Sequence, residues 1–223
     1  YDPTMVGLLL VESYIKSGEK EKGLRVAKKL AENMRENANI QHHLGYIYQI
    51  TSDIDQAIKK FEQALVIEPN HTKSVVSLAN LDYQSGNVDA AINRLKKALI
   101  ISENDTYLIT TLAKLYNRNN NSAASVILLE EQFKLNNKNE ELLKSLLLSY
   151  VGNKQLMIAI ETLNTYLLNQ RKTVELYLIL ASLQTLNSDV ISAVNAYKTA
   201  IKQGGDKGKI YLLIANVYQR FSK

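Results

Sequence analysis

The sequence of 223 residues has no cysteine and no tryptophan, and it has only 2 prolines and 9 glycines. Without cysteine the chain forms no structural disulfide, no thiolate metal site and no cysteine nucleophile. Few prolines and glycines mean few residues that end helices sharply, which favours a succession of helices. The longest apolar stretches, such as Leu146–Leu148, fall far short of the ~18 residues that a membrane span needs.

The charge of the chain is mildly positive, with a formal net charge of +5 at pH 7. The basic residues are scattered among acidic ones and form no arginine-rich patch, so we expect no nucleic-acid partner. The sequence begins at Tyr1 rather than at a methionine and shows no charged leader followed by an apolar segment. We therefore expect the chain to be a fragment of a longer protein.

A pattern of apolar and small residues recurs every thirty-four residues along the whole chain. It is most complete in one stretch, which contains Leu44, Gly45, Tyr48, Ala57, Phe61, Ala64 and Pro69. The same positions return further along as Leu78, Ala79, Ala91, Leu95 and Ala98, as Leu112, Ala113, Tyr116, Ser125 and Leu129, as Leu146, Leu147, Tyr150, Ala159 and Leu163, and as Leu180, Ala181, Ala193, Tyr197 and Ala200. No insertion or deletion interrupts this period.

Each period is expected to form two antiparallel helices joined by a short turn. Gly45 and Ala57 are predicted where the two helices cross most closely, because a larger side chain would push the axes apart. Turn and cap residue types, such as Gly18 and the pair Ser52–Asp53, separate the two helices. One such pair cannot bury its apolar face alone, so stability must come from stacking on its neighbours.

This pattern resembles the tetratricopeptide (TPR) repeat family over essentially the whole chain. The resemblance implies an all-α fold, a right-handed α-solenoid of antiparallel helix pairs with about six units and a final helix. We expect a single domain over residues 1–223, with repeats near 4–37, 38–71, 72–105, 106–139, 140–173 and 174–207 and a terminal helix at 208–223. Where Gln132, Leu147 and Tyr166 replace small residues, the fourth and fifth repeats are expected to pack more loosely or to bend the stack.

In the family the first helices of the repeats line a concave surface, so the resemblance implies a partner-binding groove on that side. Its predicted residues are tyrosines, amides and cations: Asn39, His42, Tyr46, Gln49, Lys73, Asn80, Tyr83, Tyr107, Lys114, Asn117 and Arg118. Tyrosine supplies contact area with one polar group, and asparagine both donates and accepts hydrogen bonds. A protein or peptide partner fits this set, and so does a polysaccharide; the alternative is that these residues only solvate the surface.

Two other features of the first helices are not assigned to the groove: the apolar residues of the last repeats and a carboxylate clamp. The apolar residues of the fifth and sixth repeats, among them Leu148 and Leu186, are expected to have a structural role. A known subset of the family holds a C-terminal carboxylate with lysine and asparagine one helical turn apart. Here Val76 precedes Asn80 by one turn, so the sequence does not reproduce that clamp.

No catalytic constellation is visible, and we expect neither enzyme activity nor a cofactor or metal. Adjacent histidines on a helix point about 100° apart, so His42 and His43 cannot ligate one metal as an i, i+4 pair would. His71 falls at a repeat boundary and is predicted to be solvated. The segment 204–209 contains glycines and lysines but lacks the glycine-to-lysine spacing of a phosphate loop, so it is interpreted as a connector.

Several segments, among them Phe61–Leu65 and Ser77–Asp82, are similar to the TPR-repeat lipoproteins of bacterial PEP-CTERM/exosortase systems. Aspartate at position 82, where the TPR family usually has tyrosine, is an unusual residue in which the chain resembles this lipoprotein group. This similarity implies an exported, envelope-anchored or periplasmic scaffold linked to exopolysaccharide export or protein sorting. Two alternatives stay open: a cytoplasmic peptide-binding adaptor, and the TPR arm of a larger enzyme such as a glycosyltransferase.

Overall fold

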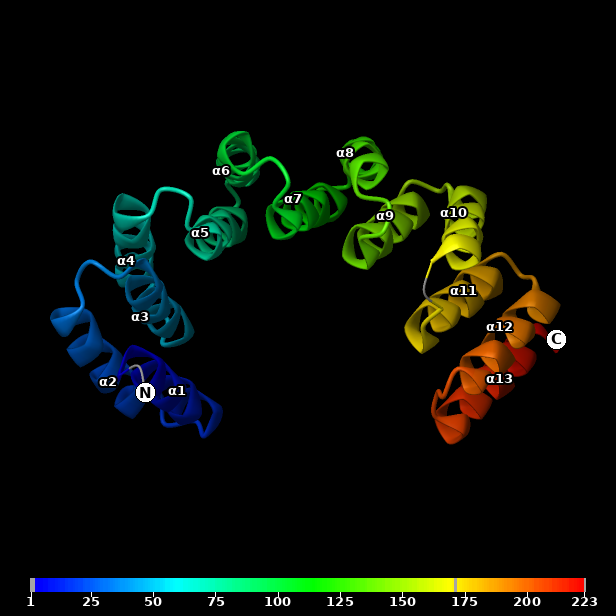
Figure 1. Ribbon diagram of the computed structural model, residues 1–223, viewed down its shortest axis with the longest axis horizontal. Helices are drawn as coiled ribbons and strands as arrows, with labels where there is room; N and C mark the ends of the chain where they lie inside the picture. Colours follow the sequence, from blue (N-terminus) through cyan, green and yellow to red (C-terminus); the bar gives the residue numbers. More distant parts are fainter. Residues whose placement is uncertain (1–2, 171, 223) are drawn as a thin grey trace. The chain divides into compact units, whose positions relative to one another are not determined.

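The computed structural model describes residues 3–170 and 172–222, which form thirteen helices and no strand. The helices are α1 (Pro3–Lys16), α2 (Lys20–Asn33), α3 (Ala38–Ile50), α4 (Ile54–Ile67), α5 (Thr72–Gln84), α6 (Val88–Ile101), α7 (Thr106–Arg118), α8 (Ser122–Leu135), α9 (Glu140–Gly152), α10 (Leu156–Asn169), α11 (Val174–Leu186), α12 (Val190–Lys202) and α13 (Lys207–Phe221). The predicted fold class, an α-solenoid of helix pairs, is confirmed (Figure 1).

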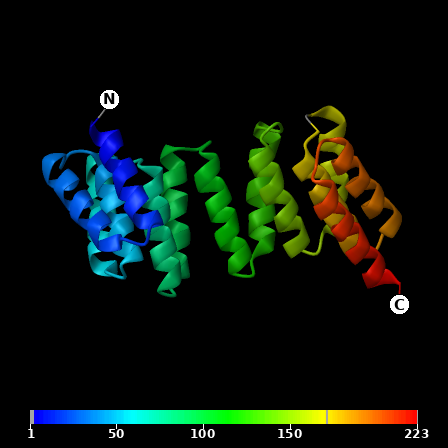
Figure 2. The same ribbon diagram turned by 90° about the horizontal axis from the view of Figure 1, so that it is seen from below.

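The chain divides into two compact units, Tyr1–Leu112 and Ala113–Lys223, and the division falls within α7. In the first unit α1 packs on α2, α3 on α4 and α5 on α6, and the pairs contact one another through α2 with α3 and α4 with α5. The second unit repeats this arrangement from α8 to α13, and Figure 2 shows neighbouring helices side by side within each unit. The single domain expected over residues 1–223 stays a prediction.

The first helices of successive repeats start at regular intervals, and side chains cap several of them. Helices α3, α5, α7, α9 and α11 begin at residues 38, 72, 106, 140 and 174, so the period of the sequence is the spacing of these helices. The side chains of Asn37, Asp53 and Asn139 each accept a hydrogen bond from a backbone N–H group of the first turn that follows. Such caps satisfy N–H groups that have no partner within the helix.

The turn inside each repeat has one residue in the left-handed region of the backbone, again at intervals of thirty-four residues. The six residues are Gly18 (φ 81°), Ser52 (φ 67°), Gly86 (φ 88°), Asn120 (φ 56°), Lys154 (φ 61°) and Ser188 (φ 61°). A side chain makes this conformation costly for any residue but glycine, and asparagine tolerates it best of the others. Because lysine and serine adopt this backbone as glycine does, we attribute the positive φ at this position to the packing of the two helices rather than to the residue type.

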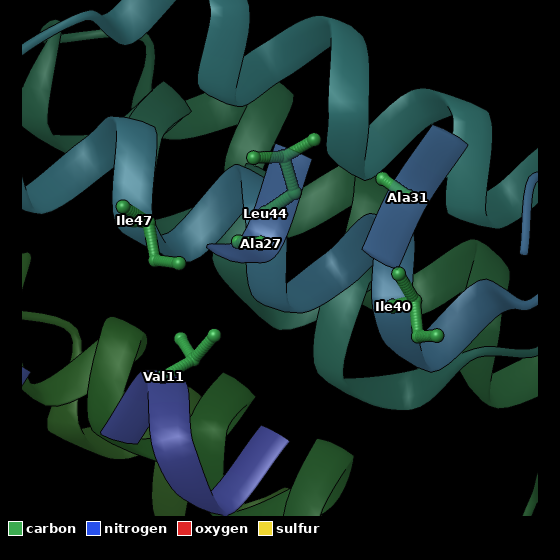
Figure 3. Packing of buried hydrophobic residues seen from close by; sticks show 6 residues of the cluster. All are labelled: Val11, Ala27, Ala31, Ile40, Leu44 and Ile47. Carbon is green, nitrogen blue, oxygen red and sulfur yellow. The ribbon is translucent and has the colours of Figure 1, made fainter. Parts of the chain in front are cut away.

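The core of each repeat is a close crossing of its two helices. Ala57, Ala91, Ser125, Ala159 and Ala193, which occupy the same position in successive repeats, are all 0% exposed. Ser125 is accommodated among the alanines because its hydroxyl lies 3.0 Å from the carbonyl oxygen of Ala113 and 2.7 Å from the Ser149 hydroxyl. At the junction of the first two repeats, an apolar cluster joins α1 and α2 to α3; it consists of Val11, Ala27, Ala31, Ile40, Leu44 and Ile47 (Figure 3).

Residues that depart from the repeat pattern have partners of their own. Asp82, at a position where α3 has Tyr48, lies 2.7 Å from the Arg94 Nε atom and so joins α5 to α6. Tyr166, at a position where α4 has the small Ala64, is 8% exposed and donates a hydrogen bond of 3.1 Å to the Lys138 carbonyl. The larger Leu147 is also buried, at 2% exposed.

We predict that Gly45→Ala destabilises the first unit. A Cβ atom at Gly45 would lie 2.8 Å from two carbons of the Phe61 ring and 3.2 Å from the Ala57 carbonyl oxygen. Overpacking of this kind costs about 1–3 kcal/mol, and urea unfolding followed by circular dichroism measures the change. Gly208→Ala is the matched control, because its Cβ would meet only Asp206 Oδ1 at 3.5 Å. Equal effects of the two substitutions would contradict the close crossing.

A candidate peptide-binding pocket on the first helices

Three predicted groove residues, His42, Tyr46 and Lys73, line one pocket of about 350 Å³ in the first unit. The wall from α1 consists of Val11, Glu12, Ile15 and Lys16, and α3 adds His43. The pocket thus uses the first helices of three successive repeats, α1, α3 and α5. Val11 is buried and provides an apolar base, whereas Tyr46 is 44% exposed at the surface.

The pocket is lined by charged side chains of both signs, the carboxylate of Glu12 and the ammonium groups of Lys16 and Lys73. Glu12 and Lys16 form an exposed ion pair of 3.9 Å between residues one helical turn apart, an arrangement that contributes little to stability. Lys73 is exposed and has no ion pair among the residues that the structure describes. Burial lowers the pKa of His43, and the Lys73 charge lowers it further, against an opposing effect of Glu12. A ligand with both a cationic and an anionic group would find partners here.

Beneath the pocket, a chain of hydrogen bonds joins the second repeat to the third. His71 caps α5 and accepts a hydrogen bond of 3.3 Å from the Ser74 N–H on its Nδ1 atom. The Nε2 atom must then carry the ring proton and donate to Asn39 Oδ1 at 3.2 Å. The Ser74 hydroxyl lies 2.9 Å from His71 Nδ1 and 3.2 Å from His42 Nδ1. His42 therefore donates to Ser74, which donates to His71, which donates to Asn39.

The prediction that His71 is solvated is wrong, since its side chain is only 6% exposed. The ring of His71 lies 5.3 Å from the ring of His42, which lies 5.2 Å from the ring of Phe61. Burial lowers the pKa of His42 to about 3, with smaller effects from the neighbouring histidines and Lys73. Burial also lowers the pKa of His71, against an opposing effect of Glu68. His71 stabilises the helix start and the repeat junction rather than facing water.

The other predicted groove residues do not line this pocket. In the first unit Gln49, Asn80 and Tyr83 are half-buried, and Tyr107 is 48% exposed. The side chain of Asn39 accepts the hydrogen bond from His71. Lys114, Asn117 and Arg118 belong to the second unit; Lys114 and Arg118 are exposed, and the Asn117 amide donates to the Ser149 hydroxyl at 2.9 Å. Sequence reasoning did not select Glu12, Lys16 and His43, although the first two occupy inward positions of the first repeat.

In the second unit, Leu148 and Leu186 do not have the structural role that we expected. Leu148 is 62% exposed and Leu186 is 51% exposed, and both line an apolar pocket of about 430 Å³ between α9 and α11. At one end of this pocket Lys144 pairs with Glu140 at 2.7 Å and with Glu175 at 2.5 Å. The helices bury other leucines, such as Leu147, and leave these two open to solvent.

Two further findings bear on the kind of site. No group of three or more histidine, cysteine or carboxylate side chains that could hold a metal lies within the described residues. None of the helices described is long and apolar enough to cross a membrane. The predicted connector over 204–209 is confirmed only as far as Asp206, because α13 already begins at Lys207; Asp206 caps this helix by accepting from the Lys209 N–H.

Comparison with known proteins agrees with the repeat pattern. Residues 51–115 match the tetratricopeptide repeat family. A tetratricopeptide repeat protein from Parabacteroides merdae is 16% identical, with a TM-score of 0.62 over 97% of this chain and 86% of that chain. PilF of Pseudomonas aeruginosa is 14% identical, with a TM-score of 0.62 over 98% of this chain and 96% of that chain. Yeast Tom70 is 15% identical, with a TM-score of 0.71 over 89% of this chain and 43% of that chain.

At these identities the solved structures establish the fold alone. No curated protein matches the sequence. The match to the tetratricopeptide repeat family covers residues 51–115, and no comparison singles out the PEP-CTERM/exosortase group.

We predict that acid weakens the first unit through the buried histidines. The unfolded chain takes up protons below the ordinary histidine pKa of 6.5, whereas His42 in the folded chain does so only near 3. Stability is therefore complete above pH 6.5 and falls as the pH drops from about 6.5 towards 3. Each fully protected histidine contributes up to ~1.4 kcal/mol per pH unit within this window. Urea unfolding of the chain at pH 7, 5.5 and 4 measures the loss.

His71→Asn is the control for this prediction, because asparagine caps a helix and does not titrate. This variant should show a shallower decline between pH 6.5 and 4 than the parent chain. An identical decline in both proteins would mean that His71 does not contribute to the acid sensitivity.

Proposed function

We propose that this chain, whose fold and repeat are those of the tetratricopeptide repeat family, is a non-catalytic scaffold that binds a peptide segment of a protein partner. The observation that supports the proposal is the pocket lined by α1, α3 and α5. It lies on the first helices of consecutive repeats, so a bound segment would contact three repeats at once. Repeat proteins commonly use such extended surfaces for binding.

The chemistry of the pocket suits a peptide better than a small polar ligand. Tyr46 offers an exposed aromatic face and a hydroxyl, a combination enriched where proteins bind one another. Lys73 and the pair of Glu12 and Lys16 provide charges of both signs at the rim. The apolar base at Val11 and Ile15 can bury one side chain of the ligand. Because no finding supports polysaccharide binding, the proposal concerns protein partners.

The proposal is tested by selecting peptides from a displayed random library against the chain and measuring their affinity by isothermal titration calorimetry. Tyr46→Ala should weaken binding of the selected peptides by about 1–3 kcal/mol, roughly 5- to 150-fold, because truncation of an aromatic anchor has effects of this size. The melting temperature should stay within about 2 °C, since the side chain is exposed.

Tyr218→Ala is the matched control, because Tyr218 is similarly exposed, at 51%, but belongs to α13 and is not among the residues that line the pocket. Peptides that lose no affinity with Tyr46→Ala, or lose as much with Tyr218→Ala, would remove this pocket as the binding site.

We also propose that the full protein is an exported envelope component linked to exopolysaccharide export or protein sorting. The support is the resemblance of segments such as Ser77–Asp82 to the PEP-CTERM/exosortase lipoproteins, including Asp82, which pairs with Arg94. Fractionation of the native organism with an antibody to this chain tests the proposal: the protein should be in the envelope fraction. Recovery from the cytosol would favour a cytoplasmic adaptor, and a longer reading frame with an α/β domain would favour the arm of an enzyme.

A further inference from the structure

A second pocket in the first unit lies on a different face of α3, between the second helices α2 and α4. Its volume is about 410 Å³, and it is lined by Lys28, Ala31, Glu32, Arg35, Gln41, Leu44, Tyr48, Lys60 and Gln63. From α3 it uses Gln41, Leu44 and Tyr48, which are three and four residues apart and so share one side of the helix. The peptide pocket uses His42, His43 and Tyr46, which lie on another side of α3.

The floor of this second pocket is formed by buried side chains. Leu44 is 2% exposed and Ala31 is 6% exposed, and Figure 3 shows both in the cluster that joins α2 to α3. Gln41 beside them is 1% exposed, and its Nε2 atom donates to the Arg35 carbonyl at 3.3 Å. An amide buried in this way is a fixed polar group at the base of the pocket.

The walls carry three cations, Lys28, Arg35 and Lys60, and two of them contact neutral groups. Lys60 Nζ donates to Gln41 Oε1 at 3.3 Å and to Gln63 Oε1 at 2.9 Å. Lys28 Nζ lies 5.5 Å from the centre of the Tyr48 ring, within the range of a cation–π contact. Arg35 follows α2 and completes the set.

These cations are not neutralised by the protein itself. None of Lys28, Arg35 and Lys60 forms an ion pair within the part of the chain that the structure describes. Glu32 is the single carboxylate in the lining, so the pocket carries three positive charges against one negative charge. Cations gathered around a concave site without ion-pair partners raise the local concentration of anions.

We propose that this pocket binds the phosphate group of a phosphorylated ligand. A phosphate monoester carries a charge of about −1.5 to −2 and three acceptor oxygens. Both match the surplus of two positive charges and the three cationic side chains. A carboxylate offers one charge and two oxygens, and it would leave one cation without a partner. Arg35 can bind two phosphate oxygens at once through its planar guanidinium.

The size and lining of the pocket indicate that the phosphate is part of a larger molecule. A volume of about 410 Å³ lies within the range of sites for small organic ligands and exceeds the space that phosphate alone would fill. Tyr48 gives the organic part of the ligand an apolar surface, and the free amide protons of Gln63 can donate to it. A phosphorylated side chain and a soluble phosphorylated metabolite share this chemistry.

The test titrates the chain with inorganic phosphate and with a peptide containing phosphoserine, beside the same peptide with serine or glutamate in its place. Binding is followed by calorimetry in a buffer without phosphate at 50 mM salt. We expect the phosphoserine peptide to bind at least tenfold more tightly than the serine and glutamate peptides. Comparable binding of inorganic phosphate would identify a free phosphorylated compound as the source, and a clear preference for the peptide would identify a phosphorylated protein.

A double variant, Arg35→Gln with Lys60→Gln, should lose at least tenfold in affinity for the tighter of the two phosphate ligands. The matched control is Lys29→Gln with Lys59→Gln, which removes two exposed lysines from the same region outside the pocket and should retain the parent affinity. Circular dichroism verifies that both variants keep the parent helix content. Equal losses in the two double variants, or equal affinity for phosphoserine and glutamate peptides, would overturn the proposal.

Discussion

The close crossing of two helices within each repeat is the constraint on which the rest of the structure depends. At Gly45 the backbone of α3 lies so near the Phe61 ring that a Cβ atom would be 2.8 Å from it. The same crossing recurs where Ala57, Ala91 and Ala159 are fully buried. The turn between the two helices has the same backbone in successive repeats. Residues as different as Gly18 and Lys154 adopt the same left-handed backbone.

Stacking of these pairs packs the α3 helix against α2, α4 and α5. Its apolar residues, among them Leu44 and Ile47, are buried against α1 and α2. Its polar residues divide between two pockets, one next to α1 and α5 and one between α2 and α4. The hydrogen bonds from His42 through Ser74 to His71 hold the α3–α5 junction beneath the first pocket. The same helix thus supports both proposed binding sites.

Much of the fold could be predicted from the sequence because its causes are local and periodic. Small residues at crossings, caps such as Asp53, and turn residues such as Gly86 depend only on position within the repeat. The burial of His71 could not be predicted in this way, since it depends on Asn39 and Ser74 from two different helices. The exposure of Leu148 was also missed, because periodicity shows which residues share a face but not what covers that face.

Of the two candidate sites, one could be predicted from the repeat period and the other could not. The repeat register placed His42, Tyr46 and Lys73 on one surface, and the structure brings these three into one pocket. The repeat register did not indicate the pocket of Lys28, Arg35 and Lys60, since these residues occupy unrelated positions in two repeats and a loop.

The central claim, that α3 supports two separate binding sites, is tested most directly by backbone amide NMR shifts in the labelled chain. A peptide selected for binding and the phosphoserine peptide would be added in separate titrations. The account predicts that the selected peptide shifts amides around Tyr46, Lys73 and Glu12, and that the phosphoserine peptide shifts amides around Lys28, Arg35 and Lys60. One common set of shifted amides for both ligands, or shifts outside both sets, would contradict it.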